Sequence, residues 1–565
     1  MHGVTLSAVT LAAAAVETAT SGESLRSENP RSSIRLLVRF GSITAIWTAV
    51  LVPVLLELNR GWRALQDDAT ISIRTSEIFS FHPPLLGQFS TSSIGSGHLL
   101  FDPGPLQYWL LAIPVRIDPS QGALWGGALA IGLVLSLGAE ALWRSGHVVA
   151  CGLFGLAILN LAWAIPSVFN RPMWNPNLSI PFLITSIVLA WLVSMGSFAW
   201  WPWLVFTASV VVQSEVFFAF FAVVLIVVPL CLGIVRRRPD RLGWLKWGLT
   251  VGLLCWLPTV LQEIRGRQPN VTLLLHAHRG PPVGIAFGLR SLGFAASTRP
   301  IWTLPSTHLV FLVFGFLNQT ALDGLLTLGL LIAIAVGAGV AGRQPLCALA
   351  TVVALCALCL VTTFGVVPKP IVYTLSYLGY VLWIVGTLVW IAVGWGIYEL
   401  AISAHRAWRR RSTGHVVGLT PSRPTKFGAA IVLVICAVAV GVVGLRSVVT
   451  SSPHYVSPDD NALASRITEL IERSTPRGPV SITFAGHPKD TSPQFGFDYV
   501  PAFAVGLGVA WQLTTDGWQP ALPAVFTSRT GLTVPKSGTH RSTVRVTING
   551  SDVTVTSVRS PTKGD

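Results

Sequence analysis

Charged side chains are scarce in this sequence, and their scarcity excludes most classes of soluble protein. Of the 565 residues, 11% are charged and 52% are hydrophobic, whereas a soluble globular domain carries about 25% charged residues. A disordered chain or a coiled coil is also much richer in charge. The composition therefore indicates a polytopic α-helical membrane protein.

Acidic residues are the scarcer of the two charged classes. The 39 Lys and Arg residues outnumber the 24 Asp and Glu residues, which gives a net charge of +15. The basic residues do not gather on one soluble module, so the excess does not indicate a nucleic-acid partner. Membrane topology explains it better, because cytoplasmic loops are enriched in Lys and Arg.

The sequence also lacks cysteines in its polar segments, and it lacks nucleotide-binding loops. All seven cysteines lie in apolar segments, so no disulfide framework is predicted. Cys356 and Cys359 form a C-x-x-C within an apolar run, which we interpret as two small helix residues. The sequence has neither a Walker pattern nor a G-x-G-x-x-G fingerprint after a strand. This argues against an ATP-driven pump and against a nucleotide-sugar donor in a Rossmann domain.

Long apolar stretches are what the chain does have, and eleven of them approach the roughly 20 residues that cross a bilayer. They cover residues 40–58, 121–142, 148–168, 178–197, 201–216, 217–235, 244–262, 322–341, 346–366, 374–403 and 427–447.

The basic residues give these predicted spans an orientation. With the N-terminus inside, nearly every cytoplasmic connection carries Arg or Lys, as in 236–246 and 405–426. The span count and the positive-inside rule then agree. We expect a plasma (inner) membrane protein with a cytoplasmic tail over 1–38 and a transmembrane domain over 39–447. Two long outer loops (59–120 and 263–321) and an extracytoplasmic C-terminal domain (448–565) complete it.

The C-terminal domain has the pattern of a small α/β fold. Residues 459–473 predict a helix, 480–485 a strand and 500–514 an apolar helix. Two alternating segments, 544–548 and 553–555, flank Asn549-Gly550 and predict a hairpin. Its acidic residues follow no motif, so we do not expect the catalytic base there.

The first outer loop opens with Gln66-Asp67-Asp68-Ala69, directly after the first predicted span. It continues to Asp102-Pro103-Gly104-Pro105-Leu106-Gln107-Tyr108, followed by an apolar helix that ends near Ile117. That helix is too short to cross the membrane, and we expect it to lie at the outer interface. The two aspartates are either catalytic carboxylates or solvent-exposed charges of a loop helix.

The layout of a basic N-terminus, one span, an aspartate motif, a long outer loop and many further spans resembles the GT-C superfamily. These are glycosyltransferases that use polyprenyl-phosphate sugars, and they include actinobacterial arabinosyl- and mannosyltransferases. The Gln-Asp-Asp-Ala and Pro-Gly-Pro-Leu elements look like those of an actinobacterial group within it. Where that group has His-Pro-Gly-Pro, this chain has Asp102-Pro103-Gly104-Pro105.

The resemblance implies transfer of a sugar from a polyprenyl-phosphate donor to a glycan, lipid or protein acceptor of the cell envelope. A general base must take the proton of the attacking hydroxyl, and a carboxylate at the membrane surface suits this task. Asp67 and Asp68 are the predicted catalytic pair, one as base and the other as orienting group or metal ligand. The family pattern favours Asp67 as base, although the residues themselves do not distinguish the two.

The leaving phosphate requires a cation, and the second outer loop offers His276, His278 and Arg279. Contact with lipid headgroups or solvent is the alternative for each. Eight further polar residues in outer loops or at outer span ends are expected to bind substrate: His82, Asp102, Tyr108, Asn175, Gln213, Glu215, Gln262 and Glu263. For Glu215 a hydrated helix end is the alternative. The sequence leaves open whether a divalent metal, Mg or Mn, takes part.

Two other functions compete with the glycosyltransferase. A transporter or flippase for a lipid-linked sugar would have two similar halves with broken spans and charges at mid-membrane. The sequence has no such internal repeat, and its carboxylates cluster outside. A non-catalytic membrane scaffold would use the C-terminal domain to bind a partner. Turnover of a polyprenyl-phosphate sugar separates the first function from these two.

Overall fold

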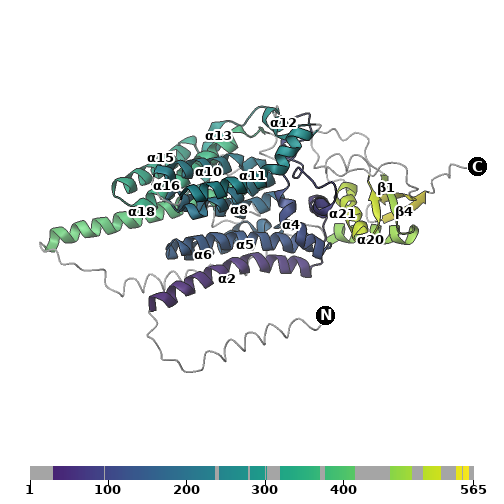
Figure 1. The fold of residues 1–565 in the computed structure, drawn as a ribbon, viewed down its shortest axis with the longest axis horizontal. Coiled ribbons are helices and arrows are strands. Elements are labelled where there is room, and N and C mark those ends of the chain that lie inside the picture. Colours follow the sequence, from purple (N-terminus) through teal and green to yellow (C-terminus); the bar gives the residue numbers. More distant parts are fainter. Residues whose placement is uncertain are drawn as a thin grey trace, which may run out of the picture.

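The chain is mostly helical, with a small sheet near its C-terminus. Its structure is a computed structural model that describes residues 30–93, 96–235, 241–266, 268–277, 280–298, 301, 319–369, 376–413, 458–485, 501–522, 542–549 and 552–558. The long helices run side by side, and the C-terminal elements α20, α21, β1 and β4 lie together at one end of them (Figure 1). The prediction of a polytopic helical chain with a small C-terminal α/β unit is confirmed at this level.

Eight helical segments among the described residues are long and apolar enough to cross a membrane. They belong to α2 (Pro30–Asn59), α5 (Gly122–Arg144), α8 (Asn175–Ser194), η4 (Val216–Phe218) with α10 (Ala219–Val235), α11 (Arg241–Arg265), α15 (Ala321–Val340), α16 (Gln344–Val366), and η8 (Ser376–Gly379) with α18 (Tyr380–Thr413).

Two of the eleven predicted spans are shorter than expected. The segments 148–168 and 201–216 form α6 (Val148–Ala164) and α9 (Trp201–Ser214), of 17 and 14 residues. Each ends where a helix-breaking or polar residue follows, Pro166 after α6 and Glu215 after α9. The eleventh predicted span, 427–447, lies outside the described residues.

Two helices extend past the predicted apolar stretches. The first begins at Pro30, ahead of the predicted start at 40, and α18 continues to Thr413, past 403. Hydropathy marks only the apolar part of a helix, whereas backbone hydrogen bonding carries the helix on through polar residues.

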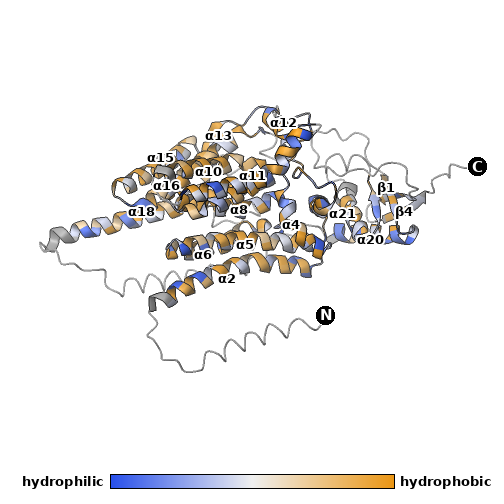
Figure 2. Cartoon of the chain, in the orientation of Figure 1, coloured by the Kyte–Doolittle hydropathy of each residue, from blue (hydrophilic) through white to orange (hydrophobic). Residues whose placement is uncertain are grey.

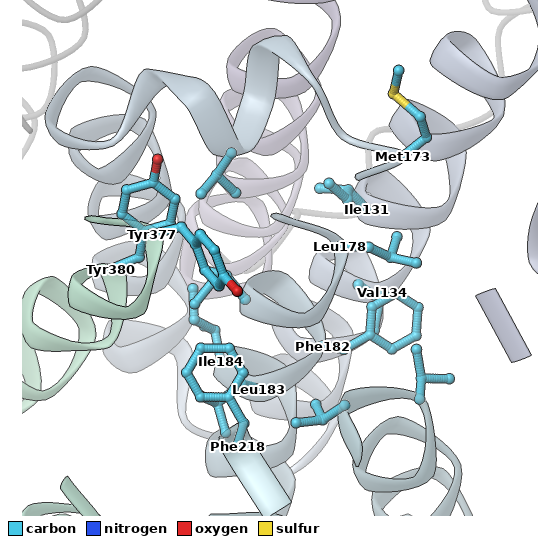
Figure 3. Close-up of a cluster of buried hydrophobic side chains, with 14 of the residues drawn as sticks. Ile131, Val134, Met173, Leu178, Phe182, Leu183, Ile184, Phe218, Tyr377 and Tyr380 are labelled. Carbon is cyan, nitrogen blue, oxygen red and sulfur yellow. The ribbon is translucent and has the colours of Figure 1, made fainter. Parts of the chain in front are cut away.

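Burial separates central from peripheral helices. In the apolar window of α8, 94% of the residues are buried, as expected of a helix that is apolar all round. The corresponding share is 17% in α11 and in α15, so their apolar surfaces face outward, where lipid would cover them. Apolar residues dominate the middle of these helices, and polar residues lie toward the ends of α11 (Figure 2). The central core joins α5, α8, η8 and the start of α18, where Tyr377 of η8 and Tyr380 of α18 bring hydroxyl groups into it (Figure 3).

One end of the helical bundle carries an ion-pair network. Arg39 of α2 donates from Nε to Glu140 of α5 at 2.8 Å, and Arg144 donates to the same carboxylate at 2.6 Å. The start of α2 and the end of α5 therefore lie together, as the predicted cytoplasmic placement of both requires. The opposite ends of these helices lead to the loops that hold the candidate site.

Short helices occupy those loops. They are α3 (Gln66–Ser76), η1 (Glu77–Phe79), η2 (Thr91–Ser93), α4 (Leu106–Ile117), α7 (Pro166–Asn170), α12 (Asn270–His276) and α13 (Ile285–Ala295). A further short helix, η3 (Phe198–Trp200), lies at the other end, where Trp200 Nε1 donates to Ser145 Oγ at 3.2 Å. With 12 residues, α4 is too short to cross a membrane. Its exposed Trp109, Ile113 and Ile117 are spaced by four residues and form one apolar stripe. This stripe suits the predicted interfacial helix.

The C-terminal unit combines two helices with a mixed sheet. Its helices are α20 (Pro458–Ser474) and α21 (Pro501–Thr515), and its strands are β1 (Pro479–Ala485), β2 (Gln519–Ala521), β3 (Ser542–Asn549) and β4 (Asp552–Val558). The strand order is β2-β1-β3-β4, with β1 parallel to both neighbours and β3 antiparallel to β4. Both predicted helices, the first strand and the hairpin are confirmed.

Candidate functional site

Asp67 and Asp68 lie in the first turn of α3, where carboxylates favour the positive end of the helix dipole. Consecutive helix residues point about 100° apart, so the two side chains diverge. Asp67 is exposed, whereas Asp68 is fully buried. The structure thus gives two sequence neighbours opposite environments, which the sequence does not distinguish.

Asp68 forms a buried ion pair with Arg171. Arg171 Nε donates to Asp68 Oδ1, and Nη2 lies against the same oxygen, while the two side chains are 1% and 0% exposed. Burial raises the pKa of Asp68 to about 6, although the charge and hydrogen bond of Arg171 act in the opposite direction. Desolvation is thus the largest of the effects on the pKa of this carboxyl.

Trp174 connects this ion pair to Asp67. The Trp174 ring receives the Arg171 guanidinium at 4.7 Å from its centroid, and its Nε1 donates to Asp67 Oδ2 at 3.0 Å. The Tyr377 ring meets it edge-on at 5.1 Å. The exposed carboxylate is therefore held by an indole whose own position is fixed by a cation and a second ring.

A third carboxylate belongs to the same arrangement. Asp102 is buried and accepts a hydrogen bond from Asn175 Nδ2 at 3.1 Å and from the Val216 backbone N–H at 3.3 Å. Burial raises the pKa of Asp102 well above its usual range, and the nearby charge of Glu215 adds to the effect. Glu215 is itself buried and caps η4 by accepting from the Phe217 N–H at 3.3 Å.

One short segment, 171–175, therefore contacts three carboxylates: Arg171 with Asp68, Trp174 with Asp67, and Asn175 with Asp102. Several hydrogen bonds fix this segment. Asn177 Nδ2 donates to the Arg171 carbonyl at 3.0 Å, and Gln107 Nε2 of α4 donates to the Met173 carbonyl at 2.6 Å. We call residues 171–175 the clamp segment, because it joins the ends of α3, α4 and α8 around the carboxylates.

The loop of Asp102 is built by a short antiparallel pairing. Phe89 bridges Phe101, and Asp102 exchanges backbone hydrogen bonds of 2.8 and 3.0 Å with Gln88 and Gly87. Gln88 Nε2 also donates to the Asp67 carbonyl at 3.3 Å. This loop is thereby attached to α3 on one side.

Gly104 places the other side of this loop against α9 and α11. A Cβ on Gly104 would lie 2.2 Å from Gln213 Oε1 and 2.6 Å from Thr259 Oγ1. Gln213 is buried and donates from Nε2 to the Cys255 carbonyl at 2.8 Å, which links α9 to α11. The close approach needs glycine at position 104.

Tyr108 and Tyr377 lie among the carboxylates without a direct bond to them. Tyr108 is buried on α4 within electrostatic reach of Asp67 and Asp102, and burial raises its pKa. Tyr377 is within reach of Asp67, Asp102 and Glu215. The predicted residues that the structure gathers in one place are Asp67, Asp68, Asp102, Tyr108, Asn175, Gln213 and Glu215.

The residues predicted in the second outer loop lie at its start or outside the described part. Gln262 donates to the Gln268 carbonyl at 2.8 Å, and Glu263 accepts from the Val271 and Thr272 N–H groups, so both shape the entry to α12. His276 is exposed at the end of α12, with Nδ1 2.8 Å from the Thr272 carbonyl.

Asn270 attaches the second outer loop to the site. Asn270, which begins α12, exchanges two hydrogen bonds with the Phe101 backbone, next to Asp102. His82 is exposed on the first loop. His278 and Arg279 lie outside the described residues.

Three neighbours of the carboxylates are absent from the sequence-based set: Arg171, Trp174 and Tyr377. The segment 170–177 is conspicuous for its polar and aromatic residues, yet nothing in it shows that Arg171 is the buried cation. Tyr377 begins a long apolar stretch and carries no local signal. Among the described residues, no group of three His, Cys, Asp or Glu side chains is arranged to hold a metal ion.

Comparison with protein-family models finds no match to this chain, and comparison with curated proteins finds none either. The site is an exposed carboxylate, oriented by an indole, beside a buried ion pair at one end of an apolar helical bundle.

Proposed function

We propose that this chain is an integral-membrane glycosyltransferase that moves a sugar from a polyprenyl-phosphate donor to a cell-envelope acceptor, with Asp67 as the general base. The observation that carries the proposal is the contrast between the two aspartates. Asp67 is exposed and oriented by Trp174, whereas Asp68 is buried against Arg171. Only the first carboxylate can meet an acceptor hydroxyl.

The chemistry requires little from the protein beyond position and charge. The acceptor oxygen attacks the anomeric carbon, the bond from that carbon to the phosphate oxygen breaks, and the hydroxyl proton passes to a base. Asp67 Oδ2 accepts one hydrogen bond, from Trp174 Nε1, and Oδ1 is free to accept the proton in this scheme. A positioned base contributes about 10²–10⁴-fold to such a step.

Asp68 and Arg171 hold the clamp segment in place in this proposal. Because both are buried, neither meets substrate directly. Arg171 supports the Trp174 ring, and that ring holds Asp67. Asp68 is thus the orienting partner of the pair.

The other buried side chains support the walls of the site. Asp102, Tyr108, Gln213 and Glu215 are each at most 3% exposed. The side-chain hydrogen bonds of Asp102, Gln213 and Glu215 go to protein groups, on the clamp segment, α11 and η4. We therefore assign these residues, with Asn175, to positioning of that loop, and assign substrate contact to exposed groups such as His82.

The donor phosphate needs a cation, and the start of the second outer loop is the proposed source. Asn270 attaches α12 to the loop of Asp102, and the exposed His276 ends that helix. His276 with His278 and Arg279 remains the proposed phosphate contact. We also propose that the site faces the extracytoplasmic side of the inner membrane, because the opposite end carries the basic network of Arg39 and Arg144.

The test is turnover by the purified chain in lipid nanodiscs. Polyprenyl-phosphate mannose and polyprenyl-phosphate arabinose serve as donors with a crude envelope glycolipid fraction as acceptor, and released polyprenyl phosphate is measured. Transfer by the wild type and its loss in Asp67→Asn would support the proposal. Movement of intact donor across sealed vesicles without bond cleavage would favour a transporter or flippase instead, and the absence of both would favour a scaffold.

A further inference from the structure

The apolar helix of the C-terminal domain is buried on every side. Residues 505–513 of α21 are buried without interruption, and nine consecutive residues cover all faces of a helix. On one side, Thr468 of α20 donates to Gln512 Oε1 at 2.9 Å. On another side, α21 packs against α3, the helix of Asp67 and Asp68. Within the small α/β unit, α21 is therefore the helix that faces the candidate site.

The closest contact on this side is with Leu65, the N-cap residue directly before α3. A Cβ on Gly508 would lie 2.2 Å from Leu65 Cδ2 and 3.1 Å from the Ala64 carbonyl oxygen. Leu65 is buried, and its carbonyl accepts the first backbone hydrogen bond of α3, from Asp68 N–H at 2.9 Å. Glycine at position 508 thus lets α21 approach the residue that begins the helix.

The backbone between Leu65 and Asp67 is strained. Gln66 has φ +49°, and it is the one non-glycine residue with positive φ in the described part of the chain. A side chain disfavours this conformation, which persists where the surrounding structure enforces it. The conformation directs the chain from the end of α2 into α3. The strained residue is thus adjacent to the residue that α21 contacts.

We propose that α21 positions the catalytic helix: the contact of Gly508 with Leu65 holds Gln66 in its left-handed conformation and so orients Asp67. This inference rests on the proposed function of Asp67. It gives the C-terminal domain a part in the reaction without a residue at the reacting atoms. Gly508, Leu65 and Gln66 are positioning residues in this scheme.

The test combines a substitution that creates a steric clash with a second substitution that relieves it. Gly508→Ala places a methyl group against Leu65, and Leu65→Ala removes the atoms that it meets. Gly337→Ala is the matched control, because Gly337 lies within α15 and a Cβ there meets nothing within 4 Å. We expect Gly508→Ala to lower kcat about tenfold with little change in KM, since a small misplacement of a catalytic group costs up to about 10²-fold. The double variant should recover to within about threefold of wild type, and Gly337→Ala should match wild type.

A second measurement does not depend on sugar transfer. A cysteine introduced by Asp67→Cys is labelled with a membrane-impermeant maleimide, and the labelling rate reports the position of that side chain. Gly508→Ala should change the rate at least threefold, Leu65→Ala in addition should restore it, and Gly337→Ala should leave it unchanged. If the wild type transfers no sugar, the proposed function fails, while this measurement still tests the positioning.

An engineered disulfide covers the case in which Gly508→Ala does not fold. A Cβ on Gly508 would lie 3.5 Å from Leu65 Cα, which suits a disulfide between Leu65→Cys and Gly508→Cys. The pair should oxidise readily, and the linked protein should keep its kcat. Failure to oxidise would overturn the proposal. So would a Gly508→Ala variant that loses thermal stability while kcat and the labelling rate at position 67 stay at wild-type values.

Discussion

Replacing Asp68 by Asn should destabilise the protein severely, although it preserves the shape of the side chain. The substitution leaves Arg171 as a buried cation, because both side chains are at most 1% exposed. Removing one partner of a buried pair costs about 3–5 kcal/mol. The variant should also lose activity, since Arg171 supports the indole that holds Asp67.

Removing both charges of the ion pair should be less harmful than removing one. Asp68→Asn with Arg171→Gln removes both charges and leaves two amides that can hydrogen-bond each other. A neutral pair leaves no uncompensated buried charge, so the double variant should recover most of the lost stability. The expected coupling between the two sites is therefore at least about 2 kcal/mol, large for a pair in contact.

Thermal unfolding in one detergent at neutral pH, followed by intrinsic tryptophan fluorescence, measures both effects. The control is Asp67→Asn, which changes an exposed carboxylate in the same helical turn and should stay within about 0.5 kcal/mol of wild type. The reasoning would be refuted by an Asp68→Asn variant as stable as wild type at neutral pH, or by a double variant no more stable than the single one.

Three further predictions concern the surroundings of the site. Trp174→Phe keeps the ring but removes the donor to Asp67, and kcat should fall about tenfold, the equivalent of one modest hydrogen bond. Gly104→Ala should cost about 1–3 kcal/mol of stability through its clash with Gln213, and adding Gln213→Ala should cost less than the sum of the two singles. Asp102→Asn should lower the apparent melting temperature less than the same substitution in the buried ion pair, because the donors to Asp102 are a neutral amide and a backbone N–H and not a cation.

Matched controls separate these effects from general damage. Trp247→Phe alters an exposed tryptophan of α11, and Gly243→Ala adds a methyl group where nothing lies within 4 Å. Both should match wild type in kcat and melting temperature. A loss in either control equal to that of its partner would remove the specific explanation.

Local sequence patterns were sufficient to predict most of the secondary structure. The helix at 459–473 and the hairpin after residue 542 follow from amphipathic and alternating periodicity, which are properties of short segments. The three-residue strand β2 and the parallel pairing of β1 depend on contacts between distant segments. No local pattern encodes them.

In the candidate site, too, the sequence predicts local features but not the contacts between distant segments. The sequence marks Asp67 and Asp68 as a pair at the start of a loop, because acidic residues are rare in so apolar a chain. Their different environments arise from Arg171, which is more than 100 residues away. The contact of α21 with Leu65 joins segments still further apart. Such contacts require the folded chain.

The most direct test of the central claim is the rate of sugar transfer by Asp67→Asn and Asp68→Asn, normalised to folded protein. If Asp67 is the general base, Asp67→Asn loses about 10²–10⁴-fold in kcat, still binds the polyprenyl-phosphate sugar, and melts like wild type. Asp68→Asn loses stability first and activity as a consequence. Wild-type transfer rates in Asp67→Asn would contradict the account.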